Sequence, residues 1–215
     1  MPSKRLLLSA ARLYVIVDAE ICGDRDPVAV ATAAADGGAD IVQWRAKSWP
    51  VPRREAVARR MAAALAPRPV LFIINDHPDL ALAAEADGVH LGQDDLPVAV
   101  VRPLLGLDRL IGVSTHSLEQ ALAAQQAGAD YIGVGPVFAT PTKPDYPAVG
   151  PDLVRQVAAR ITIPFVAIGG IDQANLPLVL SCGATRVAVV RAVAGARDVC
   201  RAAQTFKHQL IERTS

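Results

Sequence analysis

Short apolar runs alternate along the chain with longer, alanine-rich segments. Each run consists mainly of valine, isoleucine and leucine, which is typical of a parallel strand buried on both faces. The alanine-rich segments are typical of helices that cover such strands, because right-handed crossovers place a helix between successive parallel strands. The predicted strands are LYVIV (13–17), IVQWR (41–45), VLFIIN (70–75), GVHL (88–91), LIGVS (110–114), YIGV (131–134), FVAIG (165–169) and RVAVV (186–190). The clearest predicted helices are PVAVATAAADG (27–37), REAVARRMAAALA (54–66), LEQALAAQQAG (118–128) and ANLPLVLSCG (174–183).

A weak internal repeat accompanies this alternation. In each copy a helix end passes through a small-residue turn into an even-numbered strand, and the glycines suit the left-handed cap of a helix. The four copies are GGADIVQW (37–44), EADGVHLG (85–92), AGADYIGV (127–134) and CGATRVAV (182–189). Four αβ quarters with eight parallel strands predict an α/β fold, a single (β/α)8 TIM barrel.

We expect one domain over residues 1–215, in which residues 1–12 lead into the first strand. The alternative is a doubly wound open sheet. It is disfavoured because the turn after the first strand reads DAEICGD (18–24) and contains no GxGxxG motif.

Composition narrows the classes of partner. The chain has 215 residues, 52% of them apolar, which suits the large core of one α/β barrel. Aromatic residues make up 4% and the net charge is +1, so neither nucleic acid nor a membrane surface is an expected partner. Cys22, Cys182 and Cys200 lack metal-ligand spacing and fit reduced thiols of a cytoplasmic protein. A homo-oligomer is compatible with the sequence, which does not specify the number of subunits.

Residues in the last part of each predicted strand or just after it, most of them polar, lie at the end where barrels place their active sites. They are Asp18, Gln43, Arg45, Lys47, Asn75, Asp76, His90, Gln93, Asp95, Ser114, Gly169, Gly170, Val190 and Arg191. These residues predict a site for a small-molecule substrate at the carboxyl ends of the strands.

Lysine is scarce, and two of the four lysines, Lys47 and Lys143, follow predicted strands. A compact ammonium group is a good partner for phosphate oxygens. Lys143 lies in YIGVGPVFATPTKPD (131–145), where Thr140 and Thr142 add hydroxyl groups and three prolines limit the entropy lost on ordering. We interpret this long loop as an anion clamp. The alternative is that both lysines lie on a solvated rim.

Asp76 and Asp95 end neighbouring predicted strands. Two such carboxylates can hold one Mg²⁺ whose other ligands are water and substrate phosphate. The alternative is that either carboxylate caps the helix that follows it. We favour metal for the pair, because carboxylates without a cation would repel a diphosphate.

Gly169 and Gly170 precede a predicted helix, and with the turn after the last strand they predict a phosphate site. His90 would contact a heterocyclic substrate or be a core histidine bonded to backbone. Trp44 and Trp49 are expected to pack against other side chains rather than contact a cofactor.

Six motifs in order along the chain resemble the thiamine phosphate synthase (thiamine-phosphate pyrophosphorylase) family. They are VQWRAK (42–47), IINDHPDLAL (73–82), ADGVHLGQDD (86–95), IGVSTHS (111–117), YIGVGPVFATPTKPD (131–145) and AIGGI (167–171). The resemblance implies a (β/α)8 barrel and an Mg²⁺-dependent transferase. Its substrates would be (4-amino-2-methylpyrimidin-5-yl)methyl diphosphate and 5-(2-hydroxyethyl)-4-methylthiazole phosphate, and its products thiamine phosphate and diphosphate.

The resemblance also implies roles for individual residues. The pyrimidine diphosphate would be bound by Gln43, Arg45, Lys47, Asn75, Ser114 and Lys143. Of these, Lys143, Arg45, Lys47 and Ser114 would act in catalysis, and Asp76 and Asp95 would ligate Mg²⁺. The thiazole phosphate would be bound by Thr140, Thr142, Gly170, Val190 and Arg191. The implied mechanism is dissociative, so that diphosphate leaves before the thiazole nitrogen attacks a pyrimidine methylene cation.

This chain departs from the family pattern at two positions. Ala46 stands where the family usually has an acidic residue, and Arg191 where it has serine or threonine. The alternative functions are a thiazole tautomerase-like paralogue, a sugar-phosphate isomerase with Asp18 as acid and base, and a non-catalytic sensor of a phosphorylated ligand. The complete Asn75, Asp76, Asp95 and Lys143 set favours the synthase over all three.

Overall fold

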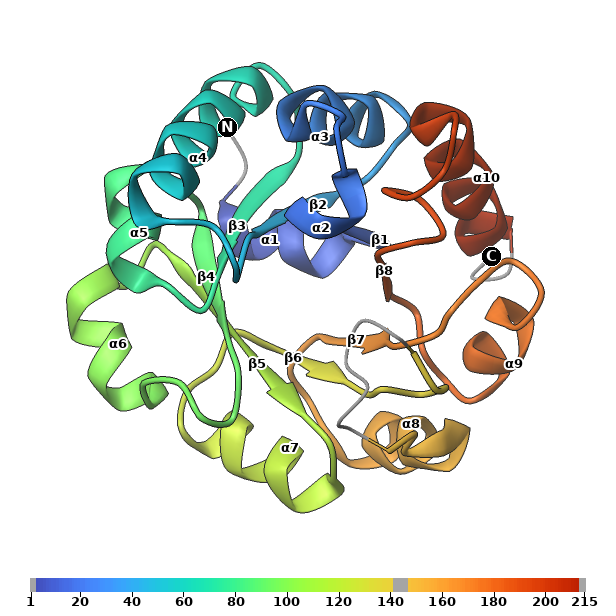
Figure 1. Cartoon of the computed structure of the whole chain (residues 1–215). Coiled ribbons are helices and arrows are strands. Elements are labelled where there is room, and N and C mark those ends of the chain that lie inside the picture. Colours follow the sequence, from blue (N-terminus) through green and yellow to red (C-terminus); the bar gives the residue numbers. More distant parts are fainter. Residues whose placement is uncertain (1–2, 141–146, 213–215) are drawn as a thin grey trace.

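Parallel strands pair in chain order around a closed barrel in the computed structural model, which describes residues 3–140 and 147–212. Eight strands are found in these residues, and β8 pairs with β1 to complete the ring (Figure 1). The predicted TIM barrel is therefore confirmed, and the predicted strand bounds differ from the observed ones by at most one residue. The strands are β1 (Leu13–Asp18), β2 (Ile41–Arg45), β3 (Leu71–Asn75), β4 (Gly88–Leu91), β5 (Leu110–Thr115), β6 (Tyr131–Val134), β7 (Phe165–Ile168) and β8 (Val187–Val189).

Helices surround the barrel on the outside (Figure 1). They are α2 (Ala19–Cys22), α3 (Pro27–Asp36), α4 (Val51–Leu65), α5 (Pro78–Ala83), α6 (Val98–Leu105), α7 (Leu118–Gln126), α8 (Gly150–Arg160), α9 (Leu176–Ser181) and α10 (Val199–Glu212). Helix α4 begins three residues earlier than predicted, since Pro52 lies in its first turn, where proline leaves no intrahelical bond unmade. None of the helices within the described ranges has both the length and the apolar character needed to cross a membrane.

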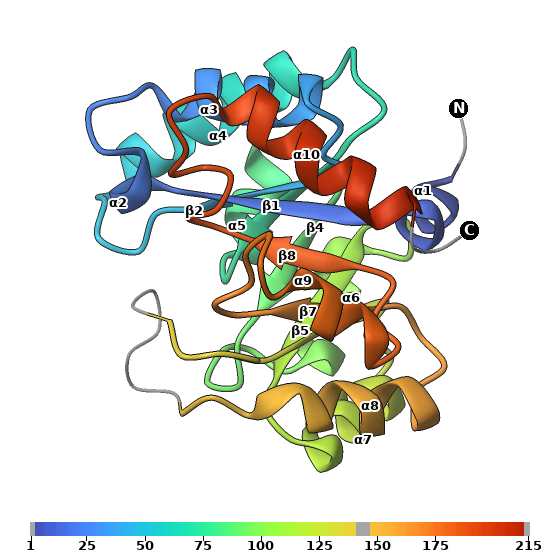
Figure 2. The ribbon, with the colours of Figure 1, turned by 90° about the vertical axis from the view of Figure 1, so that its right-hand side faces the viewer.

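The segment before β1 contains a further helix, α1 (Lys4–Ala10), where the sequence predicts only a lead-in. The Ser3 hydroxyl caps it by accepting from the Leu6 N–H at 3.3 Å. Leu8 and Ala11 are buried with the side chains that fill the barrel interior. Figure 2 shows α1 at the end of the barrel opposite α2, so this helix closes the amino-terminal mouth.

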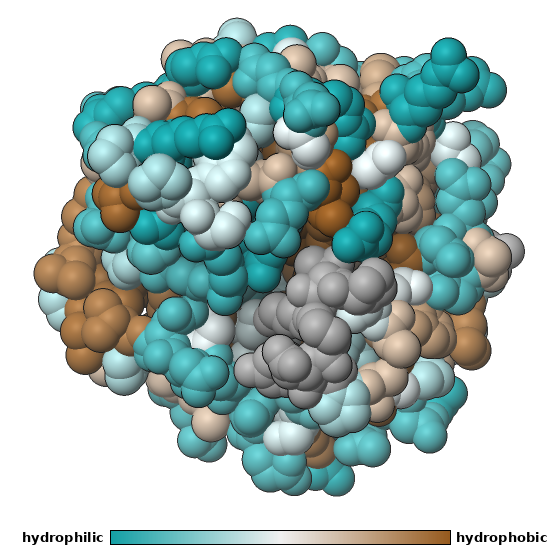
Figure 3. Space-filling model, viewed as in Figure 1, coloured by the Kyte–Doolittle hydropathy of each residue, from teal (hydrophilic) through white to brown (hydrophobic). Residues whose placement is uncertain are grey.

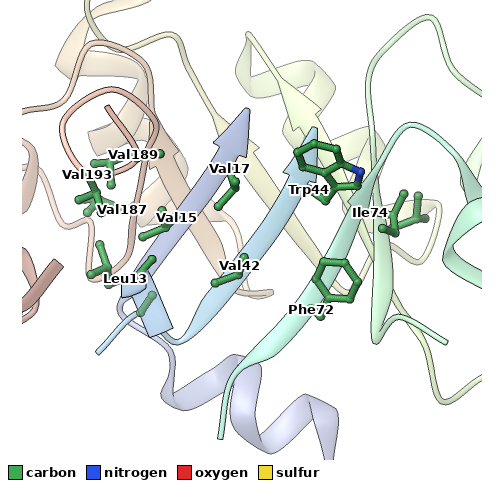
Figure 4. Close-up of a cluster of buried hydrophobic side chains, with 14 of the residues drawn as sticks. Leu13, Val15, Val17, Val42, Trp44, Phe72, Ile74, Val187, Val189 and Val193 are labelled. Atoms are coloured by element: carbon green, nitrogen blue, oxygen red, sulfur yellow. The ribbon is translucent and has the colours of Figure 1, made fainter. Parts of the chain in front are cut away.

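Two apolar layers bury the two faces of the sheet. In β1, Leu13, Val15 and Val17 point outward into the layer beneath the helices, beside Trp44 and Phe72 (Figure 4). Tyr14 and Ile16 alternate with them and point into the barrel interior. Because both faces are buried, the strands are continuous apolar runs, as the sequence indicates.

The internal repeat has a structural purpose. In three quarters an aspartate stands just before the even-numbered strand and bonds both backbone groups of one residue on the preceding strand. The carboxylate accepts from the N–H of that residue at 2.8–2.9 Å, and the aspartate N–H donates to its carbonyl at 2.8–2.9 Å. The pairs are Asp40 with Leu13, Asp87 with Phe72 and Asp130 with Ile111.

Each of these aspartates also has a cationic partner. Lys207 Nζ lies 2.6 Å from Asp40 Oδ2, Lys4 Nζ lies 3.2 Å from Asp87 Oδ1, and Arg5 Nη2 lies 2.8 Å from Asp130 Oδ1. The fourth quarter has Thr185 at the corresponding position. These contacts fix the register at the amino-terminal end of the barrel.

Candidate functional site

A cavity of about 400 Å³ opens at the carboxyl ends of the strands. Of the residues predicted to bind substrate, it is lined by Gln43, Arg45, Asn75, Ser114, Thr140, Gly170, Val190 and Arg191. These residues come from segments far apart in the sequence, which the barrel brings to one end. Figure 3 views this end of the molecule, and hydrophilic residues cover much of the face that it shows.

The predicted metal ligands lie together with Lys47. Lys47 Nζ is 3.1 Å from Asp76 Oδ2. Burial raises the pKa of Asp95, and the neighbouring charge of Asp76 raises it further. Two groups lower the pKa of Asp95: the Gly92 N–H, which donates to Asp95 Oδ2 at 2.6 Å, and the Lys47 ammonium. The two carboxylates therefore repel each other across a short distance, with one ammonium group beside them.

The backbone at Asp76 has an unusual conformation. Its φ of 63° lies in the left-handed region, which only a few per cent of non-glycine residues adopt. The Asp76 N–H donates to the His90 carbonyl at 2.8 Å, so the conformation is held by the end of β4. Such strain is often found at functional sites, where it fixes the direction of a side chain.

Neither carboxylate caps a helix, so the capping alternative is wrong for this pair. Helix α5 begins after His77 and α6 after Pro97, and neither has a side-chain cap. A carboxylate cap is found instead at Asp18, which accepts from the N–H groups of Glu20 at 3.0 Å and Ile21 at 3.3 Å.

Asp76 and Asp95 fit Mg²⁺ better than a structural transition metal. In residues 3–140 and 147–212 there is no group of three or more His, Cys, Asp or Glu side chains that could enclose a metal ion. Mg²⁺ does not need such a group, because it commonly uses one or two carboxylates and completes its shell with water and substrate phosphate. The mutual repulsion of the two carboxylates would also be relieved by a cation.

Arg45 is paired with Asp18 below the mouth of the cavity. Its Nη1 donates to Asp18 Oδ2, and the two side chains are 15% and 3% exposed. Arg45 keeps other N–H groups for a ligand, since a guanidinium has five. Asp18 is occupied by this ion pair and by the α2 cap, so it is poorly suited to the acid and base role in the isomerase alternative.

A chain of polar side chains crosses the barrel beneath the cavity. Gln43 Nε2 lies 2.6 Å from Tyr14 Oη, which lies 3.1 Å from Tyr131 Oη. His90 Nδ1 lies 3.1 Å from the same Tyr131 oxygen, and His90 Nε2 lies 3.0 Å from Ser114 Oγ. His90 thus bonds to side chains, and it also lines the cavity.

The sequence analysis did not predict a role for Tyr14 or Tyr131, the two tyrosines in this row of hydrogen-bonded side chains. The available signal was their scarcity, because the whole sequence has only three tyrosines and two stand inside predicted strands. The tryptophans behave as predicted: Trp44 is buried and packs edge-on against Trp49, with ring centroids 5.5 Å apart.

The glycine pair after β7 lies against the segment that follows β6. A Cβ on Gly169 would lie 2.4 Å from Pro136 Cα, and one on Gly170 would lie 2.8 Å from Phe138 Cβ. Both glycines also have positive φ. A side chain at either position is therefore disfavoured both by the close neighbouring atoms and by the backbone conformation. The glycines do not open the helix directly as predicted, because α9 begins at Leu176 after an intervening turn.

The two departures from the family pattern occupy different surroundings. Ala46 is buried at 8% exposure and belongs to the outer apolar layer. Arg191 is exposed at the rim of the cavity. Thr142 and Lys143 lie outside the described residues, so the predicted clamp stays a prediction.

Comparisons with known proteins agree with one another. A family model described as thiamine monophosphate synthase matches residues 13–193. The thiamine-phosphate synthase of Shouchella clausii is 48% identical over 196 residues, covering 91% of this chain and 94% of that protein. The thiamine-phosphate synthase of Halalkalibacterium halodurans is 46% identical over 205 residues, covering 94% of this chain and 96% of that protein.

Solved structures include a thiamine phosphate pyrophosphorylase from Pyrococcus furiosus with a TM-score of 0.88 and 35% identity. That match covers 97% of this chain and 100% of that chain. A 3-hexulose-6-phosphate synthase has a TM-score of 0.64 at 19% identity, which is a likeness of fold alone.

Proposed function

This chain belongs to the thiamine monophosphate synthase family, whose members are transferases of thiamine biosynthesis, and we propose the reaction that it catalyses. It joins (4-amino-2-methylpyrimidin-5-yl)methyl diphosphate to 5-(2-hydroxyethyl)-4-methylthiazole phosphate and releases diphosphate. One observation carries this proposal: the Lys47, Asp76 and Asp95 cluster stands beside a cavity lined by Gln43, Arg45, Asn75 and Ser114. A diphosphate with an organic group attached has the charge and shape for such a site.

Asp76 and Asp95 would hold Mg²⁺, and the observed lack of any larger ligand cluster in the described ranges suits an ion that shares its shell with the substrate. When bound, Mg²⁺ supplies positive charge to the diphosphate oxygens. Lys47 already neutralises part of the carboxylate charge, and its side chain is 56% exposed, so its ammonium group can turn toward a phosphate.

Arg45 and Lys47 bind the diphosphate in this proposal, and Lys143 completes the clamp from the loop after β6. As the bond between the pyrimidine methylene carbon and the diphosphate oxygen breaks, its electron pair moves to the oxygen. Fixed cations near that oxygen stabilise the developing charge at the moment when it forms. Lys143, Arg45 and Lys47 are therefore proposed catalytic residues, together with Ser114, whose side chain lines the same cavity.

Gln43, Asn75 and Ser114 hold the pyrimidine ring at the bottom of the site. Its amino group donates electron density to the methylene cation that remains. The thiazole nitrogen then forms the new carbon–nitrogen bond with its lone pair and loses no proton. No general base is required, in keeping with the occupied state of Asp18.

The thiazole phosphate is held by Thr140, Gly170, Val190 and Arg191, which line one rim of the cavity, together with Thr142. A bound thiazole captures the cation in an effectively unimolecular step, which protects it from water. Arg191 adds a cation to this rim, since its exposed side chain lines the cavity. Ala46, by contrast, lies in the outer apolar layer, away from the thiazole rim.

The test is to incubate the purified protein with both substrates and Mg²⁺, and to measure thiamine phosphate and diphosphate by chromatography. The proposal expects the two products in equal amounts and no reaction after chelation of the metal. Each alternative has its own result. A tautomerase would isomerise a thiazole phosphate without consuming the pyrimidine, and a sensor would bind ligand without turnover.

A further inference from the structure

The hydrogen-bonded chain Gln43–Tyr14–Tyr131–His90–Ser114 runs from one wall of the cavity to the other, and both of its ends line the cavity. We call this chain the relay. Tyr14 stands on β1 and Tyr131 on β6, with ring centroids 6.1 Å apart inside the barrel. Neither tyrosine lines the cavity, so the relay connects two ligand-facing groups through the floor beneath them.

The fold makes room for this chain. Gly112 stands beside the Tyr131 ring, and a Cβ there would lie 2.1 Å from Tyr131 Cζ. Two buried hydroxyl groups in a barrel interior cost more desolvation than two phenylalanines would, unless every bond is made. The relay makes those bonds, which indicates that the polar groups have a purpose beyond filling space.

Each phenol has one hydrogen, and both phenols keep it. Burial raises the pKa of Tyr14, and burial together with the neighbouring Tyr14 raises the pKa of Tyr131 well above its usual range. A phenol oxygen has one hydrogen and two lone pairs, so a reversal in the middle of the relay would leave one buried phenol hydrogen without an acceptor. Every hydrogen of the relay is bonded only when all the bonds point the same way.

The direction follows from Gln43, whose Nε2 donates to Tyr14. Tyr14 then donates to Tyr131, and Tyr131 donates to His90 Nδ1. In this direction His90 would carry its hydrogen on Nε2 and donate to Ser114 Oγ, 3.0 Å away. At the two ends, the Gln43 carbonyl oxygen and the Ser114 hydroxyl hydrogen are left to meet a ligand.

We propose that the relay fixes these two end groups and thereby selects an aminopyrimidine over the corresponding oxopyrimidine. This inference rests on the function proposed above. A 4-aminopyrimidine presents an amino donor beside a ring-nitrogen acceptor, which matches a glutamine whose oxygen faces the amino group. A 4-oxopyrimidine presents an acceptor beside an N–H donor, so it needs the glutamine reversed. Reversal at Gln43 alone would place its oxygen against the lone pairs of Tyr14, unless all the hydrogens of the relay reverse as well.

Tyr14 and Tyr131 are thus positioning residues, and their effect is measurable in binding. Calorimetry would compare (4-amino-2-methylpyrimidin-5-yl)methyl diphosphate with its 4-oxo counterpart, in the presence of Mg²⁺ and without the thiazole. We expect the wild type to prefer the amino compound by at least about 100-fold, as sites built for a specific hydrogen-bond pattern do. Tyr14→Phe and Tyr131→Phe should each reduce that ratio by about 10-fold or more, because Gln43 is then able to turn over.

The matched control is Asp40→Asn, which perturbs the other end of the barrel. It should lower stability and leave the binding ratio unchanged, so that a general loosening of the fold is distinguished from loss of the relay. A wild type that binds both compounds equally, or tyrosine variants that keep the full ratio, would overturn the inference.

Nitrogen NMR of His90 gives a second test that requires neither turnover nor a variant that folds. The relay requires neutral His90 with its hydrogen on Nε2 and Nδ1 as acceptor, whereas hydrogen on Nδ1 would overturn it. The turnover assay is separate from both tests. A protein that makes no thiamine phosphate but shows the expected tautomer and binding ratio would contradict the proposed function while supporting the relay.

Discussion

The two ends of the barrel use the same residue type in opposite ways. At the amino-terminal end, Asp40, Asp87 and Asp130 each bond both backbone groups of a residue on the preceding strand and pair with a cation. At the carboxyl end, Asp76 and Asp95 face each other, and one of them stands in a left-handed backbone conformation. The first arrangement satisfies its charges within the protein, and the second leaves charge that a ligand can satisfy.

The aspartates at the amino-terminal end are therefore expected to stabilise the fold, and those at the carboxyl end to bind a ligand. Aspartates that complete a strand pairing reduce the free energy of the folded state and need no ligand. Two carboxylates that repel each other raise it, and the barrel tolerates this because the rest of the fold is well packed. The comparison predicts that substitutions at the two ends separate activity from stability, and four experiments test this, from the largest expected effect to the smallest.

Asp76→Asn should have the largest effect on activity. Asparagine keeps the size of the side chain and tolerates positive φ, but it removes the charge that would hold Mg²⁺. We expect kcat/KM to fall by about 10³-fold, in the range of losses seen when a charge-stabilising group is removed from an active site. The free energy of unfolding without metal should stay the same or rise slightly, because the repulsion with Asp95 is lost.

The matched control for this variant is Asp79→Asn, an exposed carboxylate three residues further on, in the first turn of α5. It should keep full activity. Steady-state kinetics with saturating Mg²⁺ and urea unfolding would be measured for both proteins. An Asp76→Asn enzyme with wild-type kcat/KM would remove this residue from the metal site.

Asp130→Asn should show the reverse pattern. The Asp130 side chain is 8% exposed and contacts Arg5, Arg102 and the Ile111 N–H. Loss of its charge leaves Arg102, which is 19% exposed, without a carboxylate, at a cost of about 2–4 kcal/mol of unfolding free energy. Activity per folded molecule should not change, because this end of the barrel is remote from the cavity.

Urea unfolding measures this loss, with Asp152→Asn as control. The Asp152–Arg155 pair is exposed on both sides, so its loss should change stability by less than about 0.5 kcal/mol. Equal small effects at both positions would contradict the stabilising role of the repeated aspartates.

The sequence predicts the barrel well, for a physical reason. Strands buried on both faces must be apolar throughout, and IVQWR (41–45) and GVHL (88–91) are found with the predicted bounds. The same property prevents the sequence from showing which side chains point into the barrel. Because both faces are apolar, the alternation that would show Tyr14 and Tyr131 pointing inward is absent from the pattern.

Other features were missed because they depend on contacts distant in sequence. Helix α1 has seven residues, too few to be stable alone, and it exists because Leu8 fills the mouth of the barrel. The repeat showed Asp40, Asp87 and Asp130 at equivalent positions, but not that each carboxylate meets the backbone of another strand. The site residues Gln43, Arg45, Asn75 and Ser114 were found because they lie toward the carboxyl ends of their strands, a position that the fold class alone brings to the cavity.

The protonation of Asp95 should make both the stability of the fold and the effect of Mg²⁺ on it depend on pH. Its pKa is raised in the folded protein by burial and by Asp76, so the folded state binds a proton that the unfolded state has released. The stability that this proton contributes is complete below the unfolded pKa of about 3.9 and is lost as the pH rises through the raised folded value. Mg²⁺ competes with the same proton, so its stabilising effect should grow over that pH interval.

Thermal unfolding with and without Mg²⁺, as a function of pH, measures this effect. The shift in Tm should increase as Asp95 ionises. Asp95→Asn should weaken Mg²⁺ binding by at least about 10-fold, because even the loss of a residue that only supports a metal ligand has an effect of this size. If Mg²⁺ gave the same shift at every pH and in the variant, Asp95 would not be a ligand.

Thr185→Asp should have the smallest effect, a gain in stability. The pairing of β7 with β8 places Thr185 opposite Phe165, as Asp130 is opposite Ile111, so the fourth quarter lacks only the carboxylate. The guanidinium of Arg186 adjoins this position, and its pKa is lowered by burial and by the charge of Arg12. An aspartate here would give both arginines a partner and offer the Phe165 N–H an acceptor.

We expect Thr185→Asp to raise the free energy of unfolding in urea by about 0.5–1 kcal/mol, the size of a partly exposed ion pair, and to leave kcat/KM unchanged. A loss of stability would contradict this expectation. It would show that the fourth quarter fixes its strand register without a carboxylate, unlike the three quarters that contain Asp40, Asp87 and Asp130.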